Sequence, residues 1–362
     1  MSDRIVKIGI IGCGGIANGK HLPSLHKLKN VELVAFCDLI PERAEKAAKQ
    51  YGVPDAKVYT DYKELLKDES IEVVHVLTPN RSHSFITVDA LEAGKHVMCE
   101  KPMAINAEEA KKMVDAAKRT GKKLTIGYQN RHRPDSLFAK AEAEKGTFGE
   151  IYYAKATALR RRAVPTWGVF LNEYEQGGGP LIDIGTHALD LTLWCMNNYK
   201  PKYCVGTTYK KLGDKFPTGN DWGDWKKGDF TVEDAAFGFI VMENGATVYL
   251  ESSWALNILD AREAVTTLCG TEGGLDMNDG IRMNGIINGR QYVLKPNMAS
   301  GGAAFYEGVA NENASDREAR LWIDAVINDK TPFCTPEQAY CVSRILDGIY
   351  KSAKTGEPFY FD

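Results

Sequence analysis

The stretch GCGGIA at residues 12–17 follows the apolar segment Ile5–Ile11 and decides the expected fold. It satisfies the pattern G-x-G-x-x-G/A, which marks a strand, a tight turn and a helix start in dinucleotide-binding domains. Gly12 permits the turn, Gly14 lets backbone N–H groups approach a pyrophosphate, and Ala17 allows the helix to pack closely on the strand. We therefore expect a Rossmann-type domain at the start of the chain.

A carboxylate lies about 20 residues beyond the motif, where such domains bind the ribose of their cofactor. Asp38 follows the second predicted strand, Glu32–Cys37, and can accept hydrogen bonds from both ribose hydroxyls. It would repel a 2′-phosphate, and Leu39 offers no compensating charge, so the sequence predicts NAD and not NADP. The alternative is a plain glycine-rich turn with Asp38 as a helix cap.

The first third of the chain alternates strand-like and helix-like segments, which is typical of a doubly wound parallel sheet. Strands are predicted at Ile5–Ile11, Glu32–Cys37, Val73–Leu77, His96–Cys99 and Leu124–Gly127. The clearest helix signals are Pro41 before Glu42–Tyr51 with Gly52 as a left-handed C-cap, and Asn106 with Glu109 as a capping box for a helix that ends at Gly121.

The pattern changes after residue 127, so we expect a dinucleotide-binding domain at 1–127 and a substrate-binding and oligomerisation domain at 128–362. Helices are predicted at Asp316–Asn328 and Thr335–Thr355, and Tyr199–Phe230 is interpreted as a loop. Strands of a mainly antiparallel sheet are predicted at Phe148–Leu159, Thr231–Met242, Ala246–Ser253 and Val265–Leu268.

Composition narrows the class of function. The 362 residues suffice for two domains, and 45 basic against 48 acidic residues give a net charge of −3, without bulk attraction to nucleic acid or an anionic membrane. The sequence has no apolar run of roughly 18 residues and does not open with a signal peptide, so we expect a cytoplasmic protein. Its eight cysteines include no CxxC pair and are interpreted as reduced core residues.

Three further motifs resemble those of the Gfo/Idh/MocA family of NAD(P)-dependent sugar and cyclitol oxidoreductases. Residues 78–83 (TPNRSH) match its TPxxxH, residues 100–102 match EKP, and residues 178–190 (GGPLIDIGTHALD) match a GG-rich DxGxHxxD. The resemblance covers nearly the whole chain. It implies a Rossmann domain followed by an α/β domain with a large open sheet, and assembly into dimers or tetramers.

Lys101 is the first catalytic candidate. It follows a strand of the parallel sheet at the edge where ligands bind, and Pro102 rigidifies its turn. The resemblance implies a position near the nicotinamide and the reacting hydroxyl, where an ammonium group can stabilise a developing alkoxide. The alternative is a surface lysine before a turn proline.

Asp183 and His187 are the second and third catalytic candidates. Four residues apart at a helix start, they would share one face and could converge on one substrate. Histidine side chains titrate near neutral pH, which suits removal of a proton from a carbinol, and Asp183 could orient the substrate. The alternative is an N-capping Asp183 with a core histidine.

A zinc site of His83, Asp183 and His187 is a further alternative. Hydride transfer to a nicotinamide needs no metal ion when Lys101 supplies the positive charge, so we assign no metal.

The remaining assignments concern residues outside these motifs. Arg131 is expected to contact cofactor or substrate, Arg160 and Trp167 to form a wall against a sugar, and the Trp222 and Trp225 loop to serve aglycone binding or oligomer contacts. The predicted cofactor-binding residues are Gly12, Gly14, Gly15, Ile16, Asp38, Thr78, Pro79, Asn80, His83, Glu100, Lys101 and Gln129. The predicted substrate-binding residues are Lys101, Arg131, Arg160, Trp167, Asp183 and His187.

The function expected from these residues is NAD-dependent oxidation of a secondary hydroxyl on a sugar, glycoside or cyclitol, with C3 as the preferred position. One alternative is transient oxidation that permits glycoside hydrolysis or isomerisation with recycled NAD. Another is a non-catalytic sugar or NAD sensor, which the presence of both Lys101 and His187 disfavours. We expect a homo-oligomer that acts on a small molecule.

Overall fold

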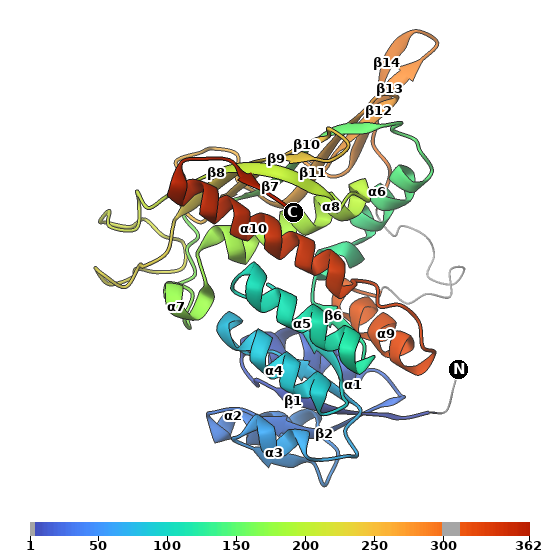
Figure 1. The fold of residues 1–362 in the computed structure, drawn as a ribbon, viewed down its shortest axis with the longest axis vertical. Helices are drawn as coiled ribbons and strands as arrows, with labels where there is room; N and C mark the ends of the chain where they lie inside the picture. Colours follow the sequence, from blue (N-terminus) through green and yellow to red (C-terminus); the bar gives the residue numbers. More distant parts are fainter. Residues whose placement is uncertain (1–3, 299–311) are drawn as a thin grey trace. The chain divides into compact units, whose positions relative to one another are not determined.

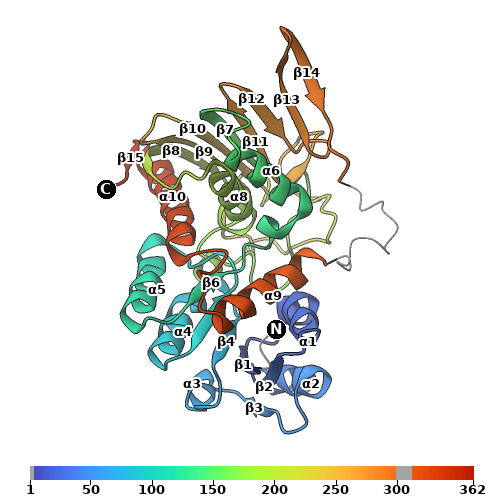
Figure 2. The same cartoon turned by 90° about the vertical axis from the view of Figure 1, so that its right-hand side faces the viewer.

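The computed structural model describes residues 4–298 and 312–362, and the chain divides into two compact units. The first unit is Met1–Gln129 with Glu312–Tyr340, and the second is Asn130–Asn311 with Cys341–Asp362. Figures 1 and 2 show both units, and each is described here by itself.

The described residues of the first unit form a six-stranded, all-parallel sheet of order β3-β2-β1-β4-β5-β6. Its strands are β1 (Val6–Ile11), β2 (Val31–Cys37), β3 (Lys57–Tyr59), β4 (Val73–Val76), β5 (His96–Cys99) and β6 (Leu124–Ile126). Its helices are η1 (Ala17–His21), α1 (Leu22–His26), α2 (Pro41–Tyr51), α3 (Tyr62–Leu66), α4 (Asn80–Glu92), α5 (Ala107–Thr120) and α9 (Ala314–Ile327). The five predicted strands of this domain are thus all present.

The late helix α9 belongs to this first unit, which the sequence analysis had placed entirely before residue 128. Its side chains Ala319, Trp322, Ile323 and Val326 share a hydrophobic core with Ile8 of β1. Figure 2 shows α9 beside α1. The apolar stripe of α9 accounts for this return of the chain, because it completes the core of the Rossmann unit.

The second unit is built on a mixed nine-stranded sheet of order β14-β13-β12-β11-β7-β10-β9-β8-β15 among the described residues. All pairs are antiparallel except β10 with β7. The strands are β7 (Ile151–Leu159), β8 (Pro201–Tyr209), β9 (Ala235–Met242), β10 (Thr247–Ser253), β11 (Arg262–Gly270), β12 (Gly273–Asp276), β13 (Arg282–Ile287), β14 (Arg290–Leu294) and β15 (Phe359–Tyr360). The predicted fold class is confirmed.

Helices α8 and α10 lie on the same side of this sheet (Figure 1). The helices of the unit are η2 (Gln129–His132), α6 (Pro134–Glu144), α7 (Glu173–Gln176), η3 (Leu181–Gly185), α8 (Thr186–Met196) and most of α10 (Pro336–Thr355). Large side chains such as Val205 and Phe239 remain exposed on the sheet. The helices therefore bury one face and leave apolar groups on the strands accessible.

Local predictions had mixed outcomes. Asn106 accepts a hydrogen bond from the Glu109 backbone N–H, and Gly121 is left-handed with φ 66°, so both ends of α5 are confirmed. Gly52 was wrong as a left-handed cap, because its φ is −76°. A Cβ at Gly52 would lie 2.7 Å from the Ala48 carbonyl oxygen, so close packing is what restricts this position to glycine.

Two further corrections concern strands. The predicted loop Tyr199–Phe230 begins with β8, and its irregular part follows Tyr209. The strands β3 and β12 to β14 were not predicted at all, because they are short or expose most of their side chains and so lack a clear apolar alternation.

All eight cysteines are free. Within residues 4–298 and 312–362, no helix is both long and apolar enough to span a lipid bilayer.

Candidate active site

The glycine-rich turn after β1 leaves open space next to its backbone. Gly12 has φ +93°, and a Cβ there would lie 2.6 Å from the Leu77 carbonyl oxygen, so the turn itself requires glycine. At Gly14 and Gly15, by contrast, an added Cβ would meet no described atom within 4 Å. The chain therefore leaves room at a helix start, where backbone N–H groups can bind an anion, and this space fits the pyrophosphate of a dinucleotide.

Asp38 is fixed beside this turn. Its Oδ2 accepts a hydrogen bond from the Cys13 N–H at 2.8 Å, and its Oδ1 accepts one from the Ile40 N–H at 2.9 Å. The helix-cap alternative is wrong, because the N-cap of α2 is Ile40 and no side chain caps that helix. Each carboxylate oxygen keeps a second lone pair, so Asp38 can still accept the ribose hydroxyls of NAD.

The TPNRSH segment joins β4 to α4, which begins at Asn80. His83 of this segment is buried, and its two ring nitrogens lie 2.8 Å from the Pro102 and Thr78 carbonyl oxygens. Burial lowers its pKa, although the two carbonyl oxygens act in the opposite direction. The neutral imidazole carries a single N–H, so it donates to one of these two carbonyl groups. His83 therefore links two turns, and instead of the expected cofactor contact both of its ring nitrogens face carbonyl groups of the protein.

Glu100 lies just before the catalytic candidate Lys101 and is the centre of a buried polar network. Its Oε1 accepts hydrogen bonds from Lys20 Nζ and His21 Nε2, both at 2.7 Å, and its Oε2 accepts one from the Lys101 N–H at 3.0 Å. Lys20 also pairs with Glu318 of α9 at 2.8 Å. Glu100 was expected to contact the cofactor, whereas in the structure its partners are internal and hold the Lys101 turn.

These contacts shift the pKa of Glu100. Burial alone would raise it, but the positive charge of Lys20 and the hydrogen bond from His21 outweigh that effect and hold the pKa well below its ordinary value. The network therefore keeps a carboxylate ionised inside the first unit, next to Lys101, which is predicted to stabilise the developing alkoxide.

In the second unit, Asp183 and His187 lie at another helix start. Asp183 is in the π-helical segment η3, directly before α8, and is not an N-cap. It is 8% exposed, and its Oδ2 accepts a hydrogen bond from the Trp254 indole N–H at 3.0 Å. His187 is half-buried in the first turn of α8. π-Helical turns occur frequently at functional sites, and this one presents a fixed carboxylate close in sequence to a histidine.

The two glycines before η3 are packed tightly against their own chain. A Cβ at Gly178 would overlap the hydroxyl oxygen of Tyr350, and one at Gly179 would overlap the backbone carbonyl of Glu233. The Glu233 carboxylate accepts hydrogen bonds from the Gly179 and Leu181 N–H groups at 2.8 and 3.1 Å, and from the Tyr350 hydroxyl at 2.8 Å. Glu233 therefore anchors the start of the segment that carries Asp183.

Sequence reasoning missed Lys20, His21, Glu233, Trp254 and Tyr350. Each lies far in the sequence from the motif that it supports, so no local pattern connects them. The pair Gly178-Gly179 was a usable signal, because adjacent glycines beside a helix start indicate either a ligand or a close approach of the chain.

Arg131 was wrongly expected to contact a ligand. It is fully buried, and its guanidinium makes a two-point ion pair with Asp190, with Nε–Oδ2 at 2.9 Å and Nη2–Oδ1 at 2.6 Å. It also lies 5.7 Å from the centre of the Trp194 ring. Arg131 thus stabilises the helix α8 from within the core of the second unit.

Other predicted residues remain accessible. Gln129 is half-buried in η2, Ile16 and Trp167 are 41% and 53% exposed, and Arg160 pairs with Glu263 at 2.5 Å. Within the described ranges, no group of three or more His, Cys, Asp or Glu residues could hold a metal ion.

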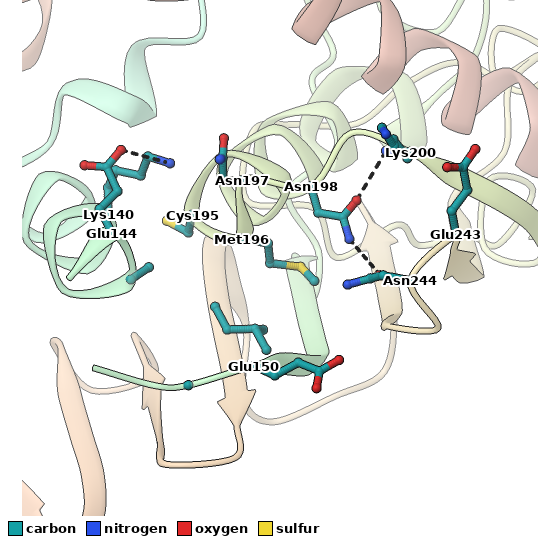
Figure 3. Close-up of a pocket in the computed structure, with 13 residues that line it drawn as sticks. Lys140, Glu144, Glu150, Cys195, Met196, Asn197, Asn198, Lys200, Glu243 and Asn244 are labelled. Atoms are coloured by element: carbon teal, nitrogen blue, oxygen red, sulfur yellow. Dashed lines mark hydrogen bonds and ion pairs between the residues drawn. The ribbon is translucent and has the colours of Figure 1, made fainter. Parts of the chain in front are cut away.

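A cavity of about 690 Å³ lies at the other end of α8 from His187 (Figure 3). Its lining includes Asn197, Asn198 and Asn244, and the Asn198 amide donates a hydrogen bond to Asn244 at 3.0 Å. None of the predicted catalytic or ligand-binding residues lines it. This cavity is therefore not part of the predicted site, and the helix starts that carry the motifs remain the candidates.

Comparisons with known proteins agree with this geometry. Residues 6–128 match the family described as "Oxidoreductase family, NAD-binding Rossmann fold", and residues 137–276 match the "GFO/IDH/MocA C-terminal domain". The chain is 34% identical over 356 residues to D-glucoside 3-dehydrogenase of Escherichia coli K12, covering 98% of this chain and 97% of that one. The chain belongs to the Gfo/Idh/MocA family.

Further relatives of this Gfo/Idh/MocA protein are similar over different spans. An inositol 2-dehydrogenase/D-chiro-inositol 3-dehydrogenase of Lactiplantibacillus plantarum is 31% identical over 54% of this chain and 53% of its own length. A structure of levoglucosan dehydrogenase with NADH and levoglucosan shares the fold, with a TM-score of 0.83 at 22% identity over 98% of this chain and 99% of that one. The protein is thus an NAD-dependent dehydrogenase that acts on CH–OH groups, and the space at Gly14 and Gly15 fits its cofactor.

Proposed function

We propose that this dehydrogenase oxidises a secondary hydroxyl of a sugar, glycoside or cyclitol, and that C3 of a glucoside is the preferred position. The substrate class is inferred from the similarity, over nearly the full length of the chain, to a D-glucoside 3-dehydrogenase. The proposal is supported by the placement of Asp183 and His187 at one helix start, where a carboxylate and an imidazole can bind neighbouring hydroxyls.

The roles of three side chains follow from their chemistry. His187 accepts the proton of the reacting hydroxyl, and Lys101 donates to the same oxygen, which stabilises its alkoxide character. Asp183 accepts a hydrogen bond from a neighbouring hydroxyl, and its Oδ2 is kept in position by the indole N–H of Trp254. Bound NAD⁺ supplies the acceptor for the hydride that leaves the carbinol carbon.

Internal contacts keep these groups in place. The Lys101 backbone N–H donates to Glu100, so the turn carrying the ammonium group is fixed from within the first unit. Glu233 fixes the start of η3 in the second unit through the Gly179 and Leu181 N–H groups. Fixed geometry of this kind is what lets charged groups stabilise a transition state efficiently.

The experiment is a panel of monosaccharides, glycosides and inositols with NAD⁺, in which NADH absorbance is followed and products are identified by NMR. We expect a 3-keto glucoside as the main product. Oxidation of inositols alone would contradict the preference for glucosides. Release of an aglycone without net NADH would instead assign the reaction to NAD-recycling hydrolysis.

We also propose that copies of the chain associate through the exposed face of the nine-stranded sheet. Phe239 is 43% exposed, and its register partners on the neighbouring strands are Val205 and Tyr249. A second copy would bury this apolar face, which a monomer leaves in water. Light scattering after gel filtration should show an oligomer that Phe239→Lys weakens, and a monomeric wild type would contradict it.

We further propose that the protein is located in the cytoplasm. Its eight free thiols are compatible with that reducing compartment.

A further inference from the structure

Two surface segments of the second unit are fastened to each other by hydrogen bonds. The Asn220 side chain accepts from the Val164 N–H at 2.8 Å and donates to the Val164 carbonyl at 3.0 Å. The Asp221 N–H donates to the Arg162 carbonyl at 2.9 Å, and the Thr166 hydroxyl donates to the Trp222 carbonyl at 2.7 Å. The loop around Trp222 is therefore held in place by hydrogen bonds to residues 162–166.

This fastening brings two exposed indoles together. The rings of Trp167 and Trp222 lie 5.1 Å apart at 58°, although the residues are 53% and 43% exposed. The Arg160 guanidinium lies 5.0 Å from the centre of the Trp222 ring and is itself held by Glu263. Leaving two large aromatic rings in water forgoes the free energy of burying them, so a rigid, exposed pair of this kind is typical of a binding surface.

The pair is the outer end of a row of aromatic rings that starts at the candidate active site. Trp254 is fully buried and donates its indole N–H to Asp183. Phe170 is next, with its ring 6.4 Å from that of Trp254 and 6.0 Å from that of Trp167. The row thus leads within one unit from the carboxylate proposed to hold the reacting sugar to the exposed indoles.

We propose that Trp167 and Trp222 form an aglycone subsite, which binds a flat apolar ring attached to the sugar that is oxidised. This inference rests on the proposed function and narrows its substrate class to glycosides with a ring-shaped aglycone. Indole rings stack on other aromatic rings, and such pairs contribute binding free energy beyond the area that they bury. The exposed strand face around Phe239, and not this pair, is the surface proposed above for a second copy.

The test compares phenyl and methyl glucosides of the same anomeric configuration. For the wild type, we expect kcat/KM with NAD⁺ to be several-fold higher for the phenyl glucoside. Trp222→Ala should lower the ratio of the phenyl to the methyl value roughly threefold to tenfold, as expected for loss of one aromatic contact, and Trp167→Ala should lower the same ratio. Phe216→Ala is the matched control, since Phe216 is 47% exposed on the same loop but packs on Trp225.

Calorimetric titration of both glucosides into the NADH complex makes the same comparison without turnover. Tighter binding of phenyl glucoside that is lost in Trp222→Ala supports the subsite even if the hydroxyl oxidised differs from the one proposed. Equal binding of both glucosides by the wild type, or equal losses for both in the variants, would overturn it. Dissociation of an oligomer in Trp222→Ala with an unchanged phenyl-to-methyl ratio would also overturn it and assign the pair to a contact between copies.

Discussion

The glycines at the two helix starts meet opposite surroundings. Before η1, an added Cβ at Gly14 or Gly15 would find no described atom within 4 Å. Before η3, an added Cβ at Gly178 or Gly179 would overlap Tyr350 or Glu233. In the first unit the missing side chains leave space for a ligand, whereas in the second they let the chain pack on itself.

The two helix starts otherwise have the same local structure. Each enters an α-helix through a π-helical segment, η1 before α1 and η3 before α8. The first offers backbone N–H groups, and the second offers the Asp183 and His187 side chains. The comparison teaches that a glycine pair beside a helix start identifies a special position without telling whether a ligand or the protein itself occupies the space.

The sharpest way to break the comparison is Gly179→Ala. The new methyl group would overlap the Glu233 backbone, which cannot move without disturbing the start of η3, so we expect loss of folding or a destabilisation above about 3 kcal/mol. Urea unfolding followed by circular dichroism measures it. Gly19→Ala is the control, because it lies in η1 with no atom within 4 Å and should be neutral or stabilising by up to about 1 kcal/mol. Normal stability of Gly179→Ala would refute the packing role.

The next largest effect is expected for Glu100→Gln. It removes the charge that pairs with Lys20 inside the first unit, and breaking a buried ion pair typically costs about 3–5 kcal/mol. Because the pKa of Glu100 is lowered in the folded state, its contribution to stability is present above the ordinary pKa of 4.5 and is lost as the pH falls through the folded value.

Urea unfolding at pH 7 and at successive values below 4.5 tests this sign. The difference in stability between wild type and Glu100→Gln should be largest at pH 7 and should shrink on acidification. Glu108→Gln, at a side chain 82% exposed beside Lys112, should change stability by no more than about 0.5 kcal/mol. A difference that grows at low pH would contradict the lowered pKa.

How far the sequence anticipates the structure differs between these regions. The Gly-rich turn and the capping of α5 were predictable, because each depends on residues that are close together in the chain. Asp38 was predictable because its spacing from the turn is characteristic of dinucleotide-binding domains. The return of α9 to the first unit, the buried state of Arg131 and the anchoring of η3 by Glu233 were not, since each depends on a contact between distant segments. His83 was likewise predictable only in part. Its motif identifies the position, but it does not reveal the two carbonyl oxygens that lie next to its ring nitrogens.

Asp38→Asn tests the prediction that the first helix start binds NAD. It removes a charge-assisted acceptor from the ribose hydroxyls, and such hydrogen bonds contribute about 1.5–3 kcal/mol, so NADH affinity should fall roughly tenfold to a hundredfold. Binding of NADPH should weaken less or improve, because the repulsion of a 2′-phosphate is gone. Fluorescence titration of both cofactors measures the ratio. Tighter binding of NADPH than NADH by the wild type would refute the cofactor assignment.

The smallest expected effect on stability is that of Gly14→Ala. The methyl group enters open space, so unfolding should change by no more than about 0.5 kcal/mol. The same methyl group occupies the place of the pyrophosphate, so NADH affinity should fall at least about tenfold. Destabilisation comparable to that of Gly179→Ala, or unchanged NADH binding, would erase the contrast between the two helix starts.

We propose that the first helix start binds the cofactor and that the second carries the catalytic base. The most direct test is His187→Ala, with NADH binding and single-turnover oxidation measured on one preparation. General base catalysis contributes about a hundredfold to ten-thousandfold, so glucoside oxidation should fall by at least a hundredfold while NADH affinity stays at the wild-type value. Oxidation at the wild-type rate would contradict the catalytic assignment of the second helix start.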